Sequence, residues 1–307
     1  MVKQWPQMIG IGSSVYDTLM MVPRFPEEDT KLEGLETKVQ GGGPCATALV
    51  AARKLGVSSA YMGTIGDDPF GRYMLEDLEH WGVDTDYVRR VPGVVSFHAV
   101  VFLNTQRNTR TCIWNRGTVP QPLREDVNEE ALSQAKVLHL DGHMLEAAIA
   151  AAKLCHTYGV KVSQDAGGTY PGVEELLPYV DWLIPSEEFA LRMTGEESPE
   201  AAAHRLYERY RPELLVVTQG VRGGLLLDHE GLRRYESYRV DARDTNGCGD
   251  TFHGAFVAAK IKGMNNDSAC RYASAAAAIK CTRLGARQAM PDDAECRAFL
   301  AGRGVAL

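Results

Sequence analysis

The sequence predicts an α/β fold with a mostly parallel sheet that is covered by helices on both faces. Short apolar runs of four to eight residues alternate with longer segments of helical period along the chain. Such runs are typical of strands that are buried between two layers of helices. The chain has 307 residues, 45% hydrophobic and 24% charged, so it is long enough to bury a substantial core.

The order of these segments suits parallel strands that are joined by crossover helices. The predicted strands are Met8–Gly12, Ala60–Ile65, Val137–Leu140, Val160–Ser163, Trp182–Ile184, Leu214–Thr218 and Gly224–Leu227. The predicted helices are Pro44–Leu55, Pro69–Trp81, Leu145–Tyr158, Pro199–Tyr210, Thr251–Lys262 and Asp267–Cys281. Pro44 suits the first position of a helix and Gly56 the position just after its end.

Two segments break this order and predict a second, smaller sheet. Thr18–Gln40 and Ser96–Trp114 alternate apolar and polar residues, with no helix between their halves. This alternation is typical of half-exposed antiparallel strands. No internal repeat and no linker divides the chain, so we expect no clean domain boundary.

Composition and charge exclude several classes of protein. The 33 basic and 40 acidic residues give a net charge of −7, which disfavours binding to a nucleic-acid backbone. The seven cysteines are scattered without a Cys-x-x-Cys pair, so we expect free thiols in a reducing compartment. We see no leader and no run near the ~20 apolar residues of a membrane span. We therefore expect a cytoplasmic protein with neither a membrane nor a nucleic-acid partner.

The most informative segment is Asp244–Asp250, which leads into a predicted helix. Gly247 and Gly249 allow a tight turn in which successive N–H groups point at one spot, and the helix adds the positive end of its dipole. Asp250 lies at the rim of this predicted anion hole. The combination suits phosphoryl transfer, in which the carboxylate accepts a hydroxyl proton. The alternative is that Asp250 only caps the helix and the glycines only make a turn.

A second glycine-rich segment, Gly41–Gly43, precedes the helix that begins at Pro44. Three glycines allow a polar ligand to approach the backbone closely. The alternative is a tight connection between a strand and a helix, with no ligand.

Taken together, the segments resemble the ribokinase-like (PfkB) family of carbohydrate kinases over nearly the whole chain. The resemblance rests on Gly10–Asp17, Gly41–Ala48, Gly63–Gly71, Trp81–Asp84, Val217–Gly224 and Asp244–Asp250, in that order. It implies a three-layer sandwich in a single domain of residues 1–307, with a β-sheet lid formed by about 18–40 and 96–116. It also implies ATP-dependent phosphorylation of a primary hydroxyl of a sugar.

The resemblance further implies a role for each matching residue. The catalytic residues would be Asp250 as the base, with the amides of Gly247, Cys248 and Gly249 around the transferred phosphoryl group. The substrate-binding residues would be Asp17, Gly41, Gly42, Gly43, Thr47 and Asn115. The ATP-binding residues would be Thr218, Gly220, Gly223 and Thr245. Mg²⁺ would accompany ATP, K⁺ could bind beside Asp244, and two copies could pair through their lids.

Some positions depart from the family pattern. Cys248 stands where alanine is common, and Thr47 where many members carry a sugar-binding asparagine. The Asn-x-x-Glu motif is replaced by Ser186–Phe189, which leaves Glu187 and Glu188 as candidates for indirect support of Mg²⁺.

The identity of the sugar stays open at this stage. Ribose, a ketohexose or a sulfo-sugar would fit, and Gly41–Ala48 with Lys280–Arg287 is similar to the sulfofructose-kinase branch. An anionic sugar would need a cation near the lid, for which Lys31 and Arg110 are candidates.

Three other functions have some support in the sequence. A catalytically silent sensor or assembly protein of the same fold is supported only by Cys248 and the altered Ser186–Phe189, and Asp250 opposes it. A dinucleotide site at Gly10–Val15 lacks its third glycine. His139, Asp141 and His143 lie on one face of a predicted strand and could hold a metal, although a satisfied strand end explains them as well.

Overall fold

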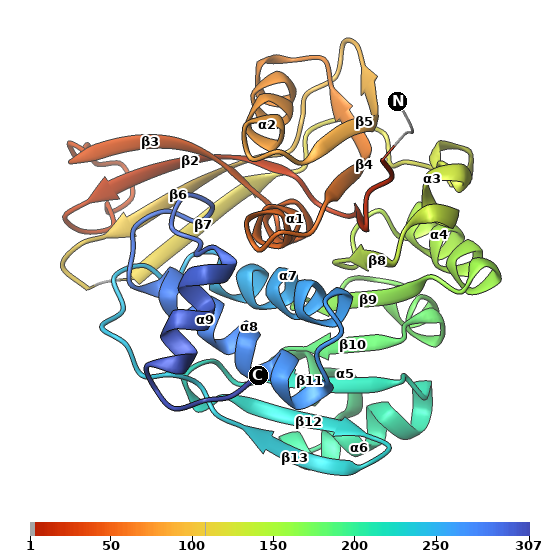
Figure 1. Cartoon of the computed structure of the whole chain (residues 1–307). Coiled ribbons are helices and arrows are strands. Elements are labelled where there is room, and N and C mark those ends of the chain that lie inside the picture. The colour runs from red at the N-terminus through yellow and green to blue at the C-terminus, as the bar shows by residue number, and fades with distance from the viewer. Residues whose placement is uncertain (1–3, 108) are drawn as a thin grey trace.

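The computed structural model describes residues 4–107 and 109–307 and contains two sheets (Figure 1). The predicted domain 1–307 and the predicted lid segment 96–116 therefore include residues (1–3 and 108) that lie outside the described part. The large sheet has nine strands, which are parallel except at the β11–β12 and β12–β13 pairs. In spatial order they are β13 (Gly231–Tyr235), β12 (Gly224–Asp228), β11 (Leu214–Thr218), β10 (Trp182–Pro185), β9 (Lys161–Ala166), β8 (Val137–Leu140), β1 (Met8–Ile11), β4 (Ser59–Gly66) and β5 (Asp84–Val91).

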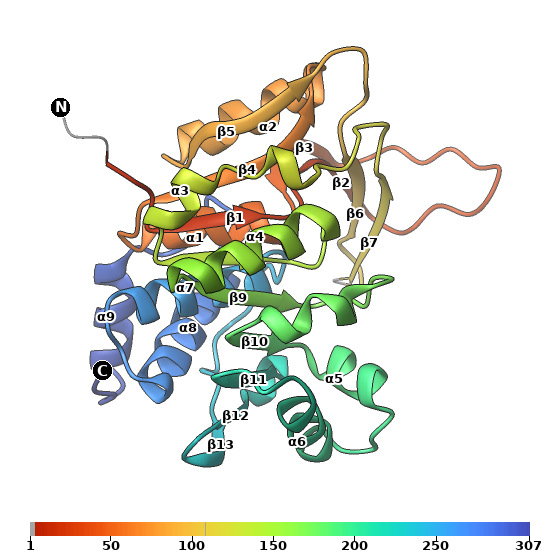
Figure 2. The same cartoon turned by 90° about the vertical axis from the view of Figure 1, so that its right-hand side faces the viewer.

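Helices cover both faces of the large sheet, as Figures 1 and 2 show. One layer contains α1 (Pro44–Lys54), α2 (Pro69–His80), α7 (Cys248–Ile261), α8 (Asn266–Cys281) and α9 (Asp293–Ala301). The other contains α3 (Glu129–Gln134), α4 (Leu145–Tyr158), α5 (Glu187–Thr194) and α6 (Pro199–Tyr210). Successive strand residues point to opposite faces, so Met8 packs in the first core and Ile9 in the second. The predicted three-layer α/β sandwich is confirmed.

The small sheet projects from one end of the large sheet and contains the two segments predicted as a lid, the name kept for it here (Figure 1). Its strands, in spatial order, are β3 (Glu36–Gly42), β2 (Val15–Val22), β6 (His98–Asn104) and β7 (Thr109–Asn115). The pairs β2–β3 and β6–β7 are antiparallel, as the alternation predicted, and β2–β6 is parallel. Leu32 and Leu35 lie in the connection between β2 and β3, so the strand pattern expected there was wrong at its centre.

The strands that the sequence did not predict lie at the two edges of the large sheet. β5 and β13 carry charged residues at partly or fully exposed positions, so they lack the apolar run that marks a buried strand. Three helices, α3, α5 and α9, were also missed; the first two are short, with six and eight residues. No helix in the described part of the chain has the length and apolar character needed to cross a membrane.

Candidate active site

The N-terminus of α7 has the backbone arrangement that the glycine pattern predicted for an anion hole. Gly247 precedes the helix with φ 74°, a left-handed conformation that favours glycine. The helix then begins at Cys248, three residues earlier than expected, so Asp250 lies in its first turn and is not its N-cap. Among the described residues the amides of Gly247 and Gly249 have no acceptor, whereas the Cys248 amide donates weakly to the Thr245 carbonyl at 3.3 Å. Unpaired amides at a helix N-terminus are suited to an anion.

The carboxylates of Asp17 on β2 and Asp250 on α7 are close enough for the charge of one to affect the pKa of the other. Burial raises the pKa of Asp250 to about 6, and the Arg110 guanidinium opposes this rise. Burial likewise raises the pKa of Asp17 to about 6, against the effect of the Arg287 guanidinium, and the Asp250 charge adds to the rise. Two half-buried carboxylates that share cations make a site in which one can bind hydroxyls and the other can accept a proton.

Arg287 holds the glycine turn between β3 and α1 against Asp17. The guanidinium is fully buried, donates to the Gly42 carbonyl at 2.8 Å and to Thr47 Oγ1 at 3.4 Å, and forms an ion pair with Asp77. A Cβ atom added at Gly42 would collide with the Asp17 carboxylate, so only glycine fits there. The sequence did not identify Arg287 as a site residue. The only local sign is that this arginine follows an alanine-rich helix, and its contact with Thr47 spans 240 residues of sequence.

Thr47 is buried and directs its hydroxyl toward Arg287. It therefore positions the guanidinium, while Gly41 and Gly42 end strand β3 as buried residues and Gly43 makes the connection to α1.

The pairing register of the lid decides which of its residues face the site. Asp17 pairs with Ala99, and Ala99 with Trp114, so residues two and four positions from Trp114, including Arg110, share the face of Asp17. Arg110 Nη1 also donates to Asn246 Oδ1 at 2.9 Å, which ties the lid to the loop before α7. Asn115 belongs to the opposite face and accepts from the Gly117 amide at 2.8 Å. The structure thus brings Arg110, not Asn115, to the candidate site.

The predicted ATP-binding residues of the β11–β12 connection lie together, beside the start of α5. Thr218 forms a bridge with Ser186, and its hydroxyl donates to the Pro185 carbonyl at 3.4 Å. Gly223 has φ 78°, which the tight turn into β12 requires. Gly220 belongs to the same turn, whereas Thr245 lies in the exposed loop before α7.

The two glutamates considered for Mg²⁺ are engaged elsewhere. Glu187 forms an ion pair with Arg222, and Glu188 lies 3.6 Å from Arg192. The part of the chain that the structure describes contains no group of three His, Cys, Asp or Glu side chains that could hold a metal ion.

Asp244, the candidate for K⁺, already has a cation beside it. Lys280 is fully buried, and its ammonium lies 2.8 Å from the Asp244 main-chain oxygen and 3.6 Å from its Oδ2. The two carboxylate oxygens also accept from the amides of Asn246 and Gly285, each at 2.8 Å. The charge of Asp244 is therefore neutralised by the protein itself.

The carboxylate of Asp141 is a structural clamp at the end of β8. It accepts from the amides of Ser13 at 2.8 Å, Cys45 at 3.2 Å and His143 at 3.0 Å, and from the Ser13 hydroxyl at 2.6 Å. His139 lies in the core, where burial lowers its pKa to about 4. Asp141 is therefore satisfied as a strand end, whereas both ring nitrogens of His139 have no hydrogen-bond partner among the described residues.

Comparison with known proteins agrees with this geometry. Residues 7–293 match the pfkB family carbohydrate kinase. The chain is 28% identical over 298 residues to a ribokinase of Haemophilus influenzae, which covers 94% of this chain and 97% of that protein. It is also 28% identical over 302 residues to a deoxyribokinase of Salmonella typhi, again with 94% and 97% coverage.

Solved structures show the same fold over the same length. The Arabidopsis thaliana ribokinase complexed with ribose and ATP has a TM-score of 0.86 and 27% identity, covering 97% of this chain and 99% of that one. The Thermotoga maritima ribokinase has a TM-score of 0.87 and 27% identity, covering 97% and 100%. Because the family match extends over nearly the whole chain and includes both sheets, this protein belongs to the pfkB family of carbohydrate kinases.

Proposed function

We propose that the protein transfers the γ-phosphoryl group of ATP to a primary hydroxyl of a sugar of the ribose, ketohexose or sulfo-sugar type. The observation that carries this proposal is the electrostatic coupling of Asp17, on strand β2 of the lid, with Asp250 in the first turn of α7. Asp17 would accept hydrogen bonds from sugar hydroxyls. Asp250 would accept the proton of the attacking hydroxyl as the new O–P bond forms and ADP leaves. The Gly247 and Gly249 amides would stabilise the charge on the transferred group.

The cofactors follow from the same residues. ATP would lie along the β11–β12 connection with its phosphates toward α7, and Mg²⁺ would enter with those phosphates, as the complex that kinases use. The Lys280 ammonium supplies the cation beside Asp244, so we expect no K⁺ requirement. The lid would close over the sugar and exclude water from the phosphoryl group. All seven cysteines are free thiols, which supports a reducing, cytoplasmic location.

The test is sugar-dependent ADP release with MgATP and a panel of ribose, fructose, tagatose, sulfofructose, phosphorylated ketohexoses and nucleosides. Asp250→Asn should keep ATP binding and lower kcat by at least about 10³-fold, because the hydroxyl loses its proton acceptor. Asp241→Asn, an exposed aspartate in the preceding loop, is the matched control and should turn over sugar like the parent.

The pH dependence of turnover gives a second measure of the same residue. Asp250 acts as a base only when it is ionised, so kcat should rise with pH through about 6 and then level off. An ordinary aspartate would place this rise near pH 4. Near-parental turnover by Asp250→Asn would exclude Asp250 as the base. ATP binding without turnover of any sugar would favour the silent sensor.

A further inference from the structure

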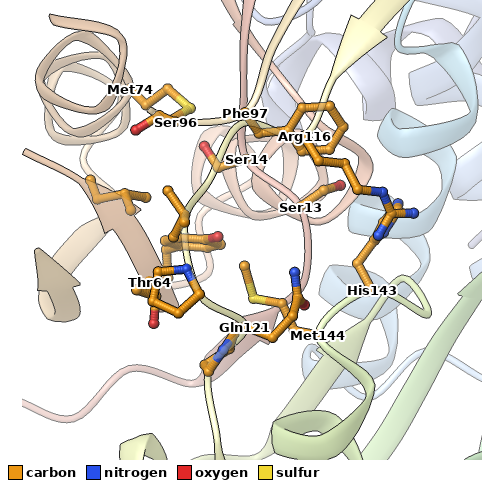
Figure 3. Close-up of a pocket in the computed structure, with 15 residues that line it drawn as sticks. Ser13, Ser14, Thr64, Met74, Ser96, Phe97, Arg116, Gln121, His143 and Met144 are labelled. Carbon is orange, nitrogen blue, oxygen red and sulfur yellow. The ribbon is translucent and has the colours of Figure 1, made fainter. Parts of the chain in front are cut away.

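A pocket beside the candidate sugar site is lined by groups that the proposed reaction does not use. It encloses about 50 Å³, several times the space that one water needs. Its polar lining comes from Ser13 and Ser14 after β1, Thr64 of β4, Arg116 after the lid, and His143 after β8, as Figure 3 shows. The remaining walls are mostly apolar.

Two hydroxyl groups in this pocket lack the hydrogen bonds that burial normally requires. Ser14 is 5% exposed and Thr64 is 3% exposed, and neither side-chain oxygen has a partner among the described residues. A buried hydroxyl without a partner costs free energy, so such groups usually meet a ligand or water.

The one charged side chain in the lining is a cation. Arg116 is an exposed residue at the rim of the pocket, and its guanidinium lies 5.5 Å from the centre of the Trp114 ring. In Figure 3 it lies on the same side of the pocket as His143. Burial lowers the pKa of His143, Asp141 opposes this shift, and Arg116 adds to it, so the neutral ring is favoured and has an N–H to donate.

The acid in contact with this lining is Asp141, whose charge opposes that of Arg116 at His143. Asp141 lies beneath the floor of the pocket, where its carboxylate already accepts four hydrogen bonds from Ser13, Cys45 and His143. The pocket surface itself therefore offers donors and a positive charge, which suit an oxyanion.

The pocket lies next to the candidate sugar site along the chain. Ser14 and Asp17 are three residues apart at the start of β2, which in an extended strand corresponds to about 10 Å. Gly43 packs directly on this segment, since a Cβ atom there would lie 2.5 Å from the Ser13 oxygen and 3.0 Å from the Ser14 Cα. The pocket lining and the candidate sugar site therefore meet where Gly43 packs on Ser13 and Ser14.

We propose that this pocket binds an oxyanion, that is a carboxylate, sulfonate or phosphate, on the sugar carbon farthest from the hydroxyl that is phosphorylated. Arg116 supplies the charge, and the hydroxyls of Ser14 and Thr64 with the His143 ring supply hydrogen bonds. This inference rests on the proposed kinase function, because it names the class of sugar that the same site would take.

The test is calorimetric binding without ATP, so that it does not depend on turnover. The probes are fructose, 2-ketogluconate, sulfofructose and fructose 6-phosphate, which differ in their charged group. The parent should bind one or more of the charged sugars at least roughly 10-fold more tightly than fructose. Arg116→Gln should lower the affinity for that charged sugar by roughly 10- to 100-fold and leave the affinity for fructose unchanged. Thr64→Val removes a hydroxyl while keeping the shape of the side chain, so it should lower the affinity for the charged sugar by a smaller factor than Arg116→Gln does.

The controls separate this inference from the proposed function. Arg90→Gln, an exposed arginine on β5, should bind every probe like the parent. Asp250→Asn should keep the preference for the charged sugar, because it changes only the proton acceptor. Equal affinity for fructose and all charged probes, tighter binding of a nucleoside, or an unchanged preference in Arg116→Gln would overturn the pocket assignment, even if neutral sugars are phosphorylated.

Discussion

The ammonium of Lys280 lies fully buried beside Asp244, in the loop that leads into the anion hole. Lys280→Ala should leave the Asp244 oxygens facing a cavity without a counter-charge, which is costly for a buried group. We expect the melting temperature and kcat of this variant to fall, and K⁺ to restore part of both because it carries the same charge. The parent should not respond to K⁺.

The measurement is turnover and thermal unfolding in KCl and in choline chloride at equal ionic strength. Lys136→Ala, an exposed lysine at the start of β8, is the matched control and should behave like the parent in both salts. Equal stimulation of the parent by K⁺ would show that Lys280 does not replace a mobile cation. If Lys280→Ala does not respond to K⁺ at any KCl concentration that leaves the protein folded, K⁺ does not take the place of the missing ammonium beside Asp244.

At the scale of elements, the anion hole depends on how α7 packs against α1. Gly254 faces α1 so closely that an added Cβ would collide with the Ala48 carbonyl and lie 2.8 Å from Ala51 Cβ. Gly254→Ala should therefore push the helices apart, lower the free energy of unfolding by about 1–3 kcal/mol, and lower kcat by displacing Asp250. Gly249→Ala points into open space in the same helix and should not lower stability. Chemical denaturation measures both; equal stability of Gly254→Ala and the parent would exclude this close packing.

The order of elements could be predicted from the sequence because each buried strand and most long helices carry their own periodicity. β8, β11, α4 and α6 have the predicted bounds. The edge strand β5 could not be predicted in this way, because it carries charged residues at partly or fully exposed positions.

Residues of the candidate site could be predicted when they lie in a local motif, and not when they depend on contacts between distant segments. Asp17 and Asp250 were predicted because each stands in a local glycine-containing motif. Whether Asn115 or Arg110 faces the site depends on the pairing register of the lid strands. A shift of one residue would turn every side chain of the strand to the opposite face. Arg287 acts on a turn at the other end of the chain, a contact that no local pattern encodes.

At the scale of the whole molecule, we propose that two copies pair through the outer face of the lid. Thr18 pairs with Val39 and Val100, and Val100 with Ile113, so these side chains form one row across all four strands. Val39 is 40% exposed and Ile113 is 58% exposed, which leaves apolar surface on an element that projects from the domain (Figure 1). Apolar surface that is gathered in one place favours association with a second surface.

Ile113→Lys should prevent this pairing, because a dimer would bring its charge against the apolar row of the second copy. Sedimentation velocity should show a concentration-dependent dimer for the parent and a monomer for Ile113→Lys. Val221→Lys, which changes a valine that is 92% exposed on the β11–β12 connection, should sediment like the parent. The lid also supplies Arg110 to the site, so a dimer that stiffens the lid should bind sugar more tightly than the monomer. A parent that stays monomeric at every concentration, or an Ile113→Lys variant that dimerises equally well, would show that the exposed row serves another purpose.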